Sequence, residues 1–152
     1  MSRRVAVTVA LAVLAGGALA GCTSPAPSPT YTYPYSNDIL DESRASPDAP
    51  PQFRDRTPYP PCPDVLLEQG EQIPDDAVAC IERAGTEGAE LAVVRPTTEG
   101  DPYVMFYRVG HGITGIEIWE DATRDAFGGG WHFASCTVAS VLAPDGCDYR
   151  DF

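Results

Sequence analysis

The chain has 152 residues, with 22 acidic residues, 10 basic residues and a formal net charge of −12. Every basic residue is an arginine. Because so acidic a chain is repelled by phosphate backbones, nucleic acid is excluded as an expected partner. The length suits one small domain with additional segments.

The first 21 residues have the order of an export signal. Arg3 and Arg4 precede an apolar run from Val5 to Ala20, which is shorter than the roughly 20 residues that a spanning helix needs. The closing residues, Leu19-Ala20-Gly21-Cys22, resemble the lipobox of bacterial lipoproteins. The resemblance implies a signal peptide over residues 1–21 and a diacylglyceryl group on Cys22. The alternative is an ordinary secretory signal followed by a chance cysteine.

Two or more acyl chains on one residue give lasting residence in a bilayer. We therefore expect a protein anchored by lipid at the extracytoplasmic face of the cell membrane, with the membrane itself as a partner.

Residues 22–61 combine the lipidated cysteine with a proline-rich segment. Ten of the residues from 23 to 61 are proline, which removes backbone donors and fixes φ. The apolar content is low, so the sequence predicts a disordered tether that ends at residue 61. Tyr31, Tyr33 and Tyr35 alternate within it and could dock on an envelope protein or the cell wall, although a solvated linker is the interpretation we favour.

Four cysteines remain: Cys62, Cys80, Cys136 and Cys147. An even set in an exported chain predicts disulfide bonds. Zinc is the competing use, but the chain has no Cys-x-x-Cys spacing, and we predict neither a metal nor a cofactor. Four cysteines permit three connectivities. We predict the local one, in which Cys62 pairs with Cys80 and Cys136 with Cys147, because each bond closes a short loop.

Residues 62–152 are predicted to form the folded domain. Val65-Leu66-Leu67 is interpreted as an extended piece or a single turn. A helix is expected over residues 75–84, where Pro74 and two acids favour its start and apolar residues recur at helical spacing. Alternating apolar residues then predict strands over 90–95, 103–109, 114–120 and 131–138.

The expected fold class is α+β. One short helix would pack on a three- to four-stranded antiparallel meander, and two disulfides would staple the domain. The strand over 103–109 is apolar on both faces, so the second face must be covered by the segment from Pro63 onward or by a partner.

The acidic loops suggest two alternative functions. Asp121–Asp125 places oxygen-bearing side chains at alternate positions, like the start of a calcium loop, but Ala126 and His132 stand where an EF-hand needs Gly and Glu. A weak calcium-dependent module is therefore kept only as an alternative. The second alternative is an envelope hydrolase that uses Asp101, Glu117, Asp121 and Asp125.

Other residues give no support for catalysis. His111 is flanked by glycines in a predicted turn, and no Gly-x-Ser-x-Gly motif surrounds Ser135 or Ser140. Gly128-Gly129-Gly130 lacks the lysine of a phosphate loop and is interpreted as a joint. Trp131 and His132, which follow it, could line a pocket, but one buried ring and one exposed ring is the interpretation we favour.

Three strings, over residues 95–102, 107–108 and 121–128, resemble small uncharacterised secreted or lipid-anchored proteins of high-GC Gram-positive bacteria. The resemblance spans residues 62–147 and implies no activity or functional residue. The leading hypothesis is a lipoprotein without enzymatic activity that serves as a binding or interaction module of the cell envelope.

Overall fold

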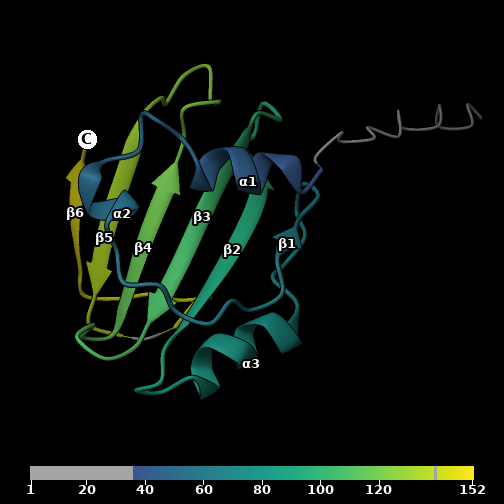
Figure 1. The fold of residues 1–152 in the computed structure, drawn as a ribbon. Coiled ribbons are helices and arrows are strands. Elements are labelled where there is room, and N and C mark those ends of the chain that lie inside the picture. The colour runs from purple at the N-terminus through teal and green to yellow at the C-terminus, as the bar shows by residue number, and fades with distance from the viewer. Residues whose placement is uncertain (1–35, 139) are drawn as a thin grey trace, which may run out of the picture. The chain divides into compact units, whose positions relative to one another are not determined.

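The computed structural model describes residues 36–138 and 140–152, which form one sheet with helices packed on it (Figure 1). The elements in chain order are α1 (Asp38–Arg44), α2 (Pro51–Arg54), β1 (Val65–Leu66), α3 (Asp75–Arg83), β2 (Ala89–Pro96), β3 (Pro102–Val109), β4 (Ile116–Asp121), β5 (Trp131–Cys136) and β6 (Cys147–Asp151). None of these helices is long and apolar enough to cross a membrane. The predicted signal peptide and Cys22 lie outside the described residues.

Within this part of the chain, the sheet has six strands in the order β1-β2-β3-β4-β5-β6. Strands β2 to β6 form an antiparallel meander, and β1 pairs with β2 in parallel. The predicted helix and four predicted strands are present as α3 and β2 to β5. The predicted fold, a meander of three to four antiparallel strands with one helix, is wrong, because the sheet is mixed and longer and carries two further helices.

The missing strands have weak local signals. β1 is two residues long and pairs Val65 with Val93 and Leu66 with Val94, so it depends on its neighbour rather than on its own pattern. β6 has almost no buried side chains and hence no apolar alternation.

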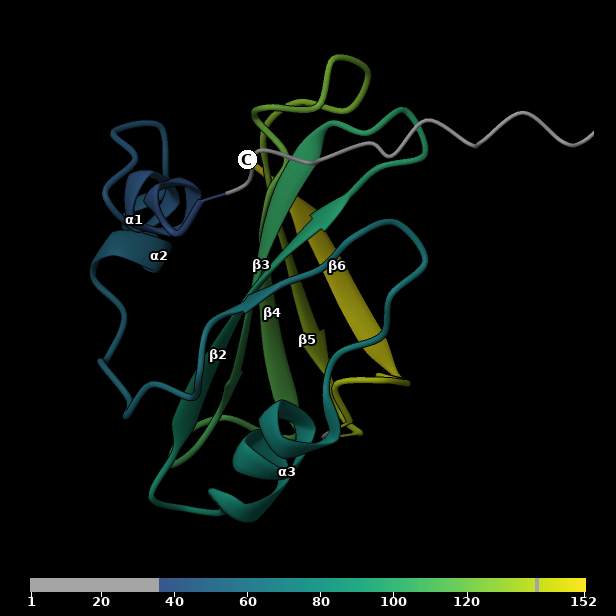
Figure 2. The same ribbon diagram turned by 90° about the vertical axis from the view of Figure 1, so that its right-hand side faces the viewer.

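Two apolar cores form because successive side chains of a strand point to opposite faces of the sheet. The first core lies under α3 and gathers Ala77, Val78 and Ile81 of that helix against residues such as Leu91 and Ile116. The second core lies on the other face, beneath α1 and α2. Its members are Leu40, Ala49, Phe53, Ala92, Val94, Val104, Phe106, Trp119 and Trp131. Figure 2 shows α3 on one side of the sheet and α1 and α2 on the other.

The predicted disordered tether is wrong for residues 36–61, and the domain begins before residue 62. Leu40 and Phe53 are fully buried, so α1 and α2 supply the cover that the second face needs. The prolines are compatible with this structure, because Pro51 occupies the first turn of α2, where a missing N–H costs nothing. In α1, acids in the first turn and Arg44 in the last match the helix dipole.

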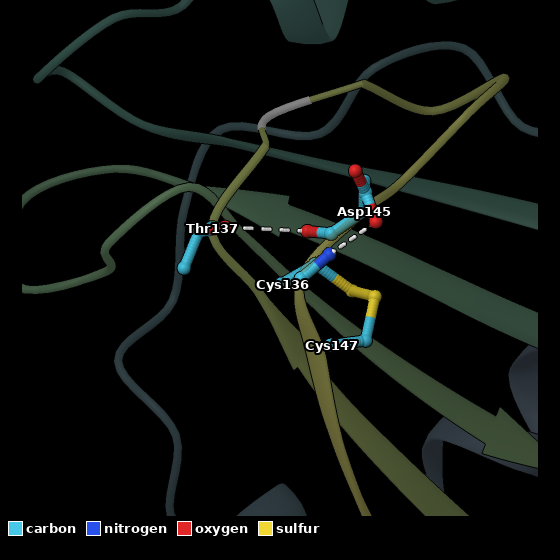
Figure 3. The surroundings of a disulfide bond; sticks show 5 residues. Cys136, Thr137, Asp145 and Cys147 are labelled. Atoms are coloured by element: carbon cyan, nitrogen blue, oxygen red, sulfur yellow. Dashed lines mark hydrogen bonds between the residues drawn. A yellow bond between two sulfur atoms is a disulfide. The ribbon is translucent and has the colours of Figure 1, made fainter.

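Both predicted disulfides are confirmed. Cys62 bonds to Cys80 with the two Cα atoms 5.9 Å apart, which fixes the segment before β1 to α3. Cys136 bonds to Cys147 with the Cα atoms 3.9 Å apart, which joins the end of β5 to the start of β6 (Figure 3). Beside the second bond, the Thr137 hydroxyl donates to the Asp145 carbonyl oxygen at 3.4 Å.

Candidate functional site

Glu117 lies apart from the other three acids of the hydrolase hypothesis, Asp101, Asp121 and Asp125. Glu117 and Asp121 lie at opposite ends of β4, about 13 Å apart along the strand. The two carboxylates of a glycosidase are closer than about 9.5 Å. Asp101 accepts a hydrogen bond from the Ala126 N–H at 3.0 Å, and Asp125 accepts one from the Phe127 N–H at 2.8 Å. These two carboxylates therefore stabilise the loop at the Asp121 end of the strand, away from Glu117.

Asp121 has a structural role instead of a ligand-binding one. Its side chain is 1% exposed and accepts hydrogen bonds from the Ser43 hydroxyl at 2.6 Å and the Thr123 hydroxyl at 2.6 Å. Arg124 also pairs with it, at 3.2 Å. The carboxylate thus fastens α1 to the loop after β4, with its oxygens occupied by protein donors. Among residues 36–138 and 140–152, no cluster of three or more His, Cys, Asp or Glu side chains could hold a metal ion.

Trp131 and His132 occupy opposite faces of β5 and do not form a pocket together. Trp131 is buried in the second core, and His132 lies on the α3 face with Nδ1 2.7 Å from Asp151 Oδ1. On that same face, burial raises the pKa of Glu120, and burial raises the pKa of Tyr107 to about 12. Both groups therefore favour their protonated forms more than free side chains do.

A cavity lies on the face of the sheet opposite to α3, between the sheet and the segment that follows α2. We call it the aromatic pocket; its volume is about 500 Å³, within the range of small-ligand sites. Its walls come from α2 and the residues after it, from the β3–β4 turn and from the outer face of β3 to β6. The lining residues are Gln52, Asp55, Arg56, Thr57, Tyr59, Arg108, His111, Gly112, Ile113, Glu117, Trp119, Phe133, Arg150 and Phe152.

Four aromatic side chains give the pocket its apolar surface. Tyr59 and Phe133 are partly exposed and Phe152 is 50% exposed, whereas Trp119 is buried beneath them. The Trp119 ring centroid lies 4.5 Å from that of Phe133 and 5.7 Å from that of Phe152. The indole Nε1–H of Trp119 is buried and has no hydrogen-bond partner within the described residues. The pocket therefore presents ring faces at its surface, whereas the Trp119 donor is buried behind them.

Two arginines of the pocket are held by a buried ion-pair network. Arg56 binds both carboxylate oxygens of Glu90, at 2.9 and 3.0 Å. Arg108 is 4% exposed and donates hydrogen bonds to the Glu117 carboxylate at 2.8 Å and to the Thr57 carbonyl oxygen. It also forms an ion pair with Glu90 at 3.2 Å. Because buried charges need partners, this network fixes the segment after α2 onto the sheet and leaves neither guanidinium free for a ligand.

Other polar side chains of the pocket are not used by the fold. Gln52, Asp55 and His111 are exposed, and the structure gives their side chains no hydrogen-bond or ion-pair partner within residues 36–138 and 140–152. The backbone around His111 is fixed, because its carbonyl oxygen accepts a hydrogen bond from the Tyr59 hydroxyl at 2.7 Å. The aromatic pocket thus contains polar side chains without partners in the described part of the chain, next to partly exposed aromatic rings.

The sequence interpretation missed this pocket. It assigned Tyr59 and the residues around it to the tether, and it treated His111 as an exposed turn residue. One signal was present, because Arg108 interrupts an apolar strand between Tyr107 and Val109. A charge in that position indicates a buried partner on the same face.

Comparisons with known proteins add no assignment. No family model matches the chain, and searches of the curated proteins and of the solved structures found no match.

Proposed function

We propose that this chain is a lipid-anchored extracytoplasmic binding module and that the aromatic pocket is its ligand site. The anchor rests on Leu19-Ala20-Gly21-Cys22 and the basic, apolar segment before it. Two disulfides agree with an oxidising compartment, where such bonds persist. The single observation that carries the binding role is a pocket of about 500 Å³ with partly exposed rings and unused polar groups at its surface.

The chemistry of the pocket favours a saccharide unit, such as those of the cell wall. A sugar ring presents a flat C–H face that can stack on Tyr59, Phe133 or Phe152. Its hydroxyl groups can donate to the Asp55 carboxylate and exchange hydrogen bonds with Gln52 and His111. Rings with a few polar groups at their edge are the usual composition of a small-ligand pocket.

The two carboxylates of the aromatic pocket, those of Asp55 and Glu117, favour binding over catalysis because only one of them is unpaired among the described residues. Glu117 is committed to Arg108, so Asp55 is the carboxylate of the pocket that remains unpaired within the described residues. A retaining or inverting sugar hydrolase needs two carboxylates across the scissile bond.

The proposal is tested by titrating the full chain with soluble oligosaccharides of the wall glycan and following tryptophan fluorescence. We expect a change in emission, because Trp119 lies in the pocket wall. Asp55→Ala should weaken binding about tenfold or more, since a hydrogen bond to a charged group contributes about 1.5–3 kcal/mol.

Asp48→Ala is the matched control, because Asp48 is also exposed but lies outside the pocket. It should bind like the wild type. The proposal fails if the oligosaccharides do not bind, or if both variants bind them as tightly as the wild type does.

A further inference from the structure

β6 forms a free edge of the sheet. It pairs with β5 on one side, and within the described residues no strand pairs with its other side. Figure 1 shows it at the left-hand border of the sheet, beyond β5. The side chains from Asp148 to Asp151 are exposed, and Tyr149 is 75% exposed. An edge of this kind offers backbone groups to another strand.

The hydrogen bonds of β6 identify the backbone groups that face outward. The Gly146 carbonyl oxygen accepts a hydrogen bond from the Thr137 N–H at 3.3 Å, and the Phe152 N–H donates to the Trp131 carbonyl oxygen at 2.9 Å. The backbone groups of Gly146 and Phe152 therefore point toward β5. Because the backbone N–H and C=O groups of successive residues point to opposite sides of an antiparallel strand, those of Asp148 and Arg150 also point toward β5. The N–H and C=O groups of Cys147, Tyr149 and Asp151 therefore point toward the free edge.

We propose that two copies of this chain pair through β6, antiparallel, about a two-fold axis at Tyr149. In this register the two Tyr149 residues exchange backbone hydrogen bonds, and Cys147 pairs with Asp151 of the second copy. Asp148 lies directly opposite Arg150 of the second copy, and the symmetry repeats that pair. Opposite charges at such positions stabilise the pairing of two strands.

Charge selects this register over its neighbours. A slip of two residues in one direction places Asp148 directly opposite Asp148 of the second copy. A slip of two residues in the other direction places Arg150 directly opposite Arg150 of the second copy. Like charges directly opposite each other are destabilising. A slip of one residue places backbone groups that point toward the free edge opposite groups of the second copy that point toward its β5. The hydrogen bonds between the two copies of β6 are then lost. The sequence Asp-Tyr-Arg is thus self-complementary in one antiparallel register.

Two charged side chains of this strand, Asp148 and Arg150, also lack ion-pair partners among the described residues of one copy. Arg150 contacts the Phe133 ring, with its guanidinium 5.8 Å from the ring centroid, but it has no carboxylate partner among the described residues. Asp148 has no ion-pair partner there either. The second copy supplies both partners, and it places the two exposed Tyr149 side chains side by side on the α3 face of the joined sheet.

Sedimentation of the full chain in density-matched detergent tests the proposal. The wild type should be a dimer. Arg150→Asp should weaken the dimer about a hundredfold, because two symmetric ion pairs become two repulsive pairs, each costing about tenfold. Asp148→Arg should have the same effect. The double variant Asp148→Arg/Arg150→Asp should restore the dimer, since each pair is again of opposite charge.

The double variant separates pairing from folding, because two changes that only damaged the strand would not compensate each other. Photo-oxidative coupling of tyrosines gives a second readout: wild-type dimers should yield a Tyr149–Tyr149 cross-link by peptide mapping, and Tyr149→Phe should remove it. A wild type that is monomeric at every concentration would overturn the proposal, whether or not β6 accepts another extended peptide. Dimers unaffected by the single reversals would also overturn it, because they would use another surface.

Discussion

Replacing Phe53 with alanine is expected to lower the free energy of unfolding by about 3–5 kcal/mol. The Phe53 side chain is fully buried, with its ring centroid 4.5 Å from that of Trp131 and 4.9 Å from that of Phe106. The Arg56 guanidinium also lies over the Phe53 ring, 3.6 Å from the ring centroid. Removing the ring leaves a cavity in the second core that a four-residue helix has little freedom to fill.

Urea unfolding followed by circular dichroism measures this effect. Phe127→Ala is the matched control, because Phe127 is 84% exposed and should change stability by less than about 0.5 kcal/mol. If Phe53→Ala were as mild as its control, residues 36–61 would not belong to the folded unit, and the tether predicted from the sequence would extend to residue 61.

Removing the Cys62–Cys80 bond with a Cys62→Ala/Cys80→Ala double variant is expected to cost about 3 kcal/mol. The bond closes a loop with a sequence separation of 18, and such a cross-link stabilises mainly by restricting the unfolded chain. Cys62 is also 3% exposed and packs in the first core, so its loss removes apolar contact. The segment that leads into β1 would lose its covalent link to α3.

The comparison variant is Cys136→Ala/Cys147→Ala, which opens a shorter loop with a separation of 11. Its cost should be slightly smaller, because loop-closure entropy grows slowly with length. Equilibrium unfolding without reductant measures both. Two variants that each remain within about 1 kcal/mol of the wild type would contradict this role for the disulfides.

The elements that were predictable are those with a strong local pattern. α3 has a proline before it, acids in its first turn and an apolar stripe, and β3 is rich in aromatic and β-branched residues. The disulfide pairing followed from short loop lengths. α2 was not predictable in this way, because four residues give no periodicity and its stability comes from one buried ring, Phe53.

The candidate site was harder to predict than the fold. Tyr59 and Glu117 lie on elements far apart in the sequence, and only the packing of α2 over the sheet brings them to one pocket. A proline-rich composition indicated disorder for residues 23–61. Residues 36–61 nevertheless pack on the sheet, because a few apolar residues are sufficient when the sheet offers an uncovered apolar face. Tertiary context, which no local window contains, decides both outcomes.

The proposed role depends most on anchoring of the protein to the membrane, and therefore on lipidation of Cys22. Metabolic labelling with a palmitate analogue, followed by membrane fractionation, tests this directly. The wild type should take up the label and sediment with membranes, whereas Cys22→Ser should do neither. Label on Cys22→Ser, or an unlabelled wild type released with the soluble fraction, would contradict the proposal of a lipid-anchored binding module.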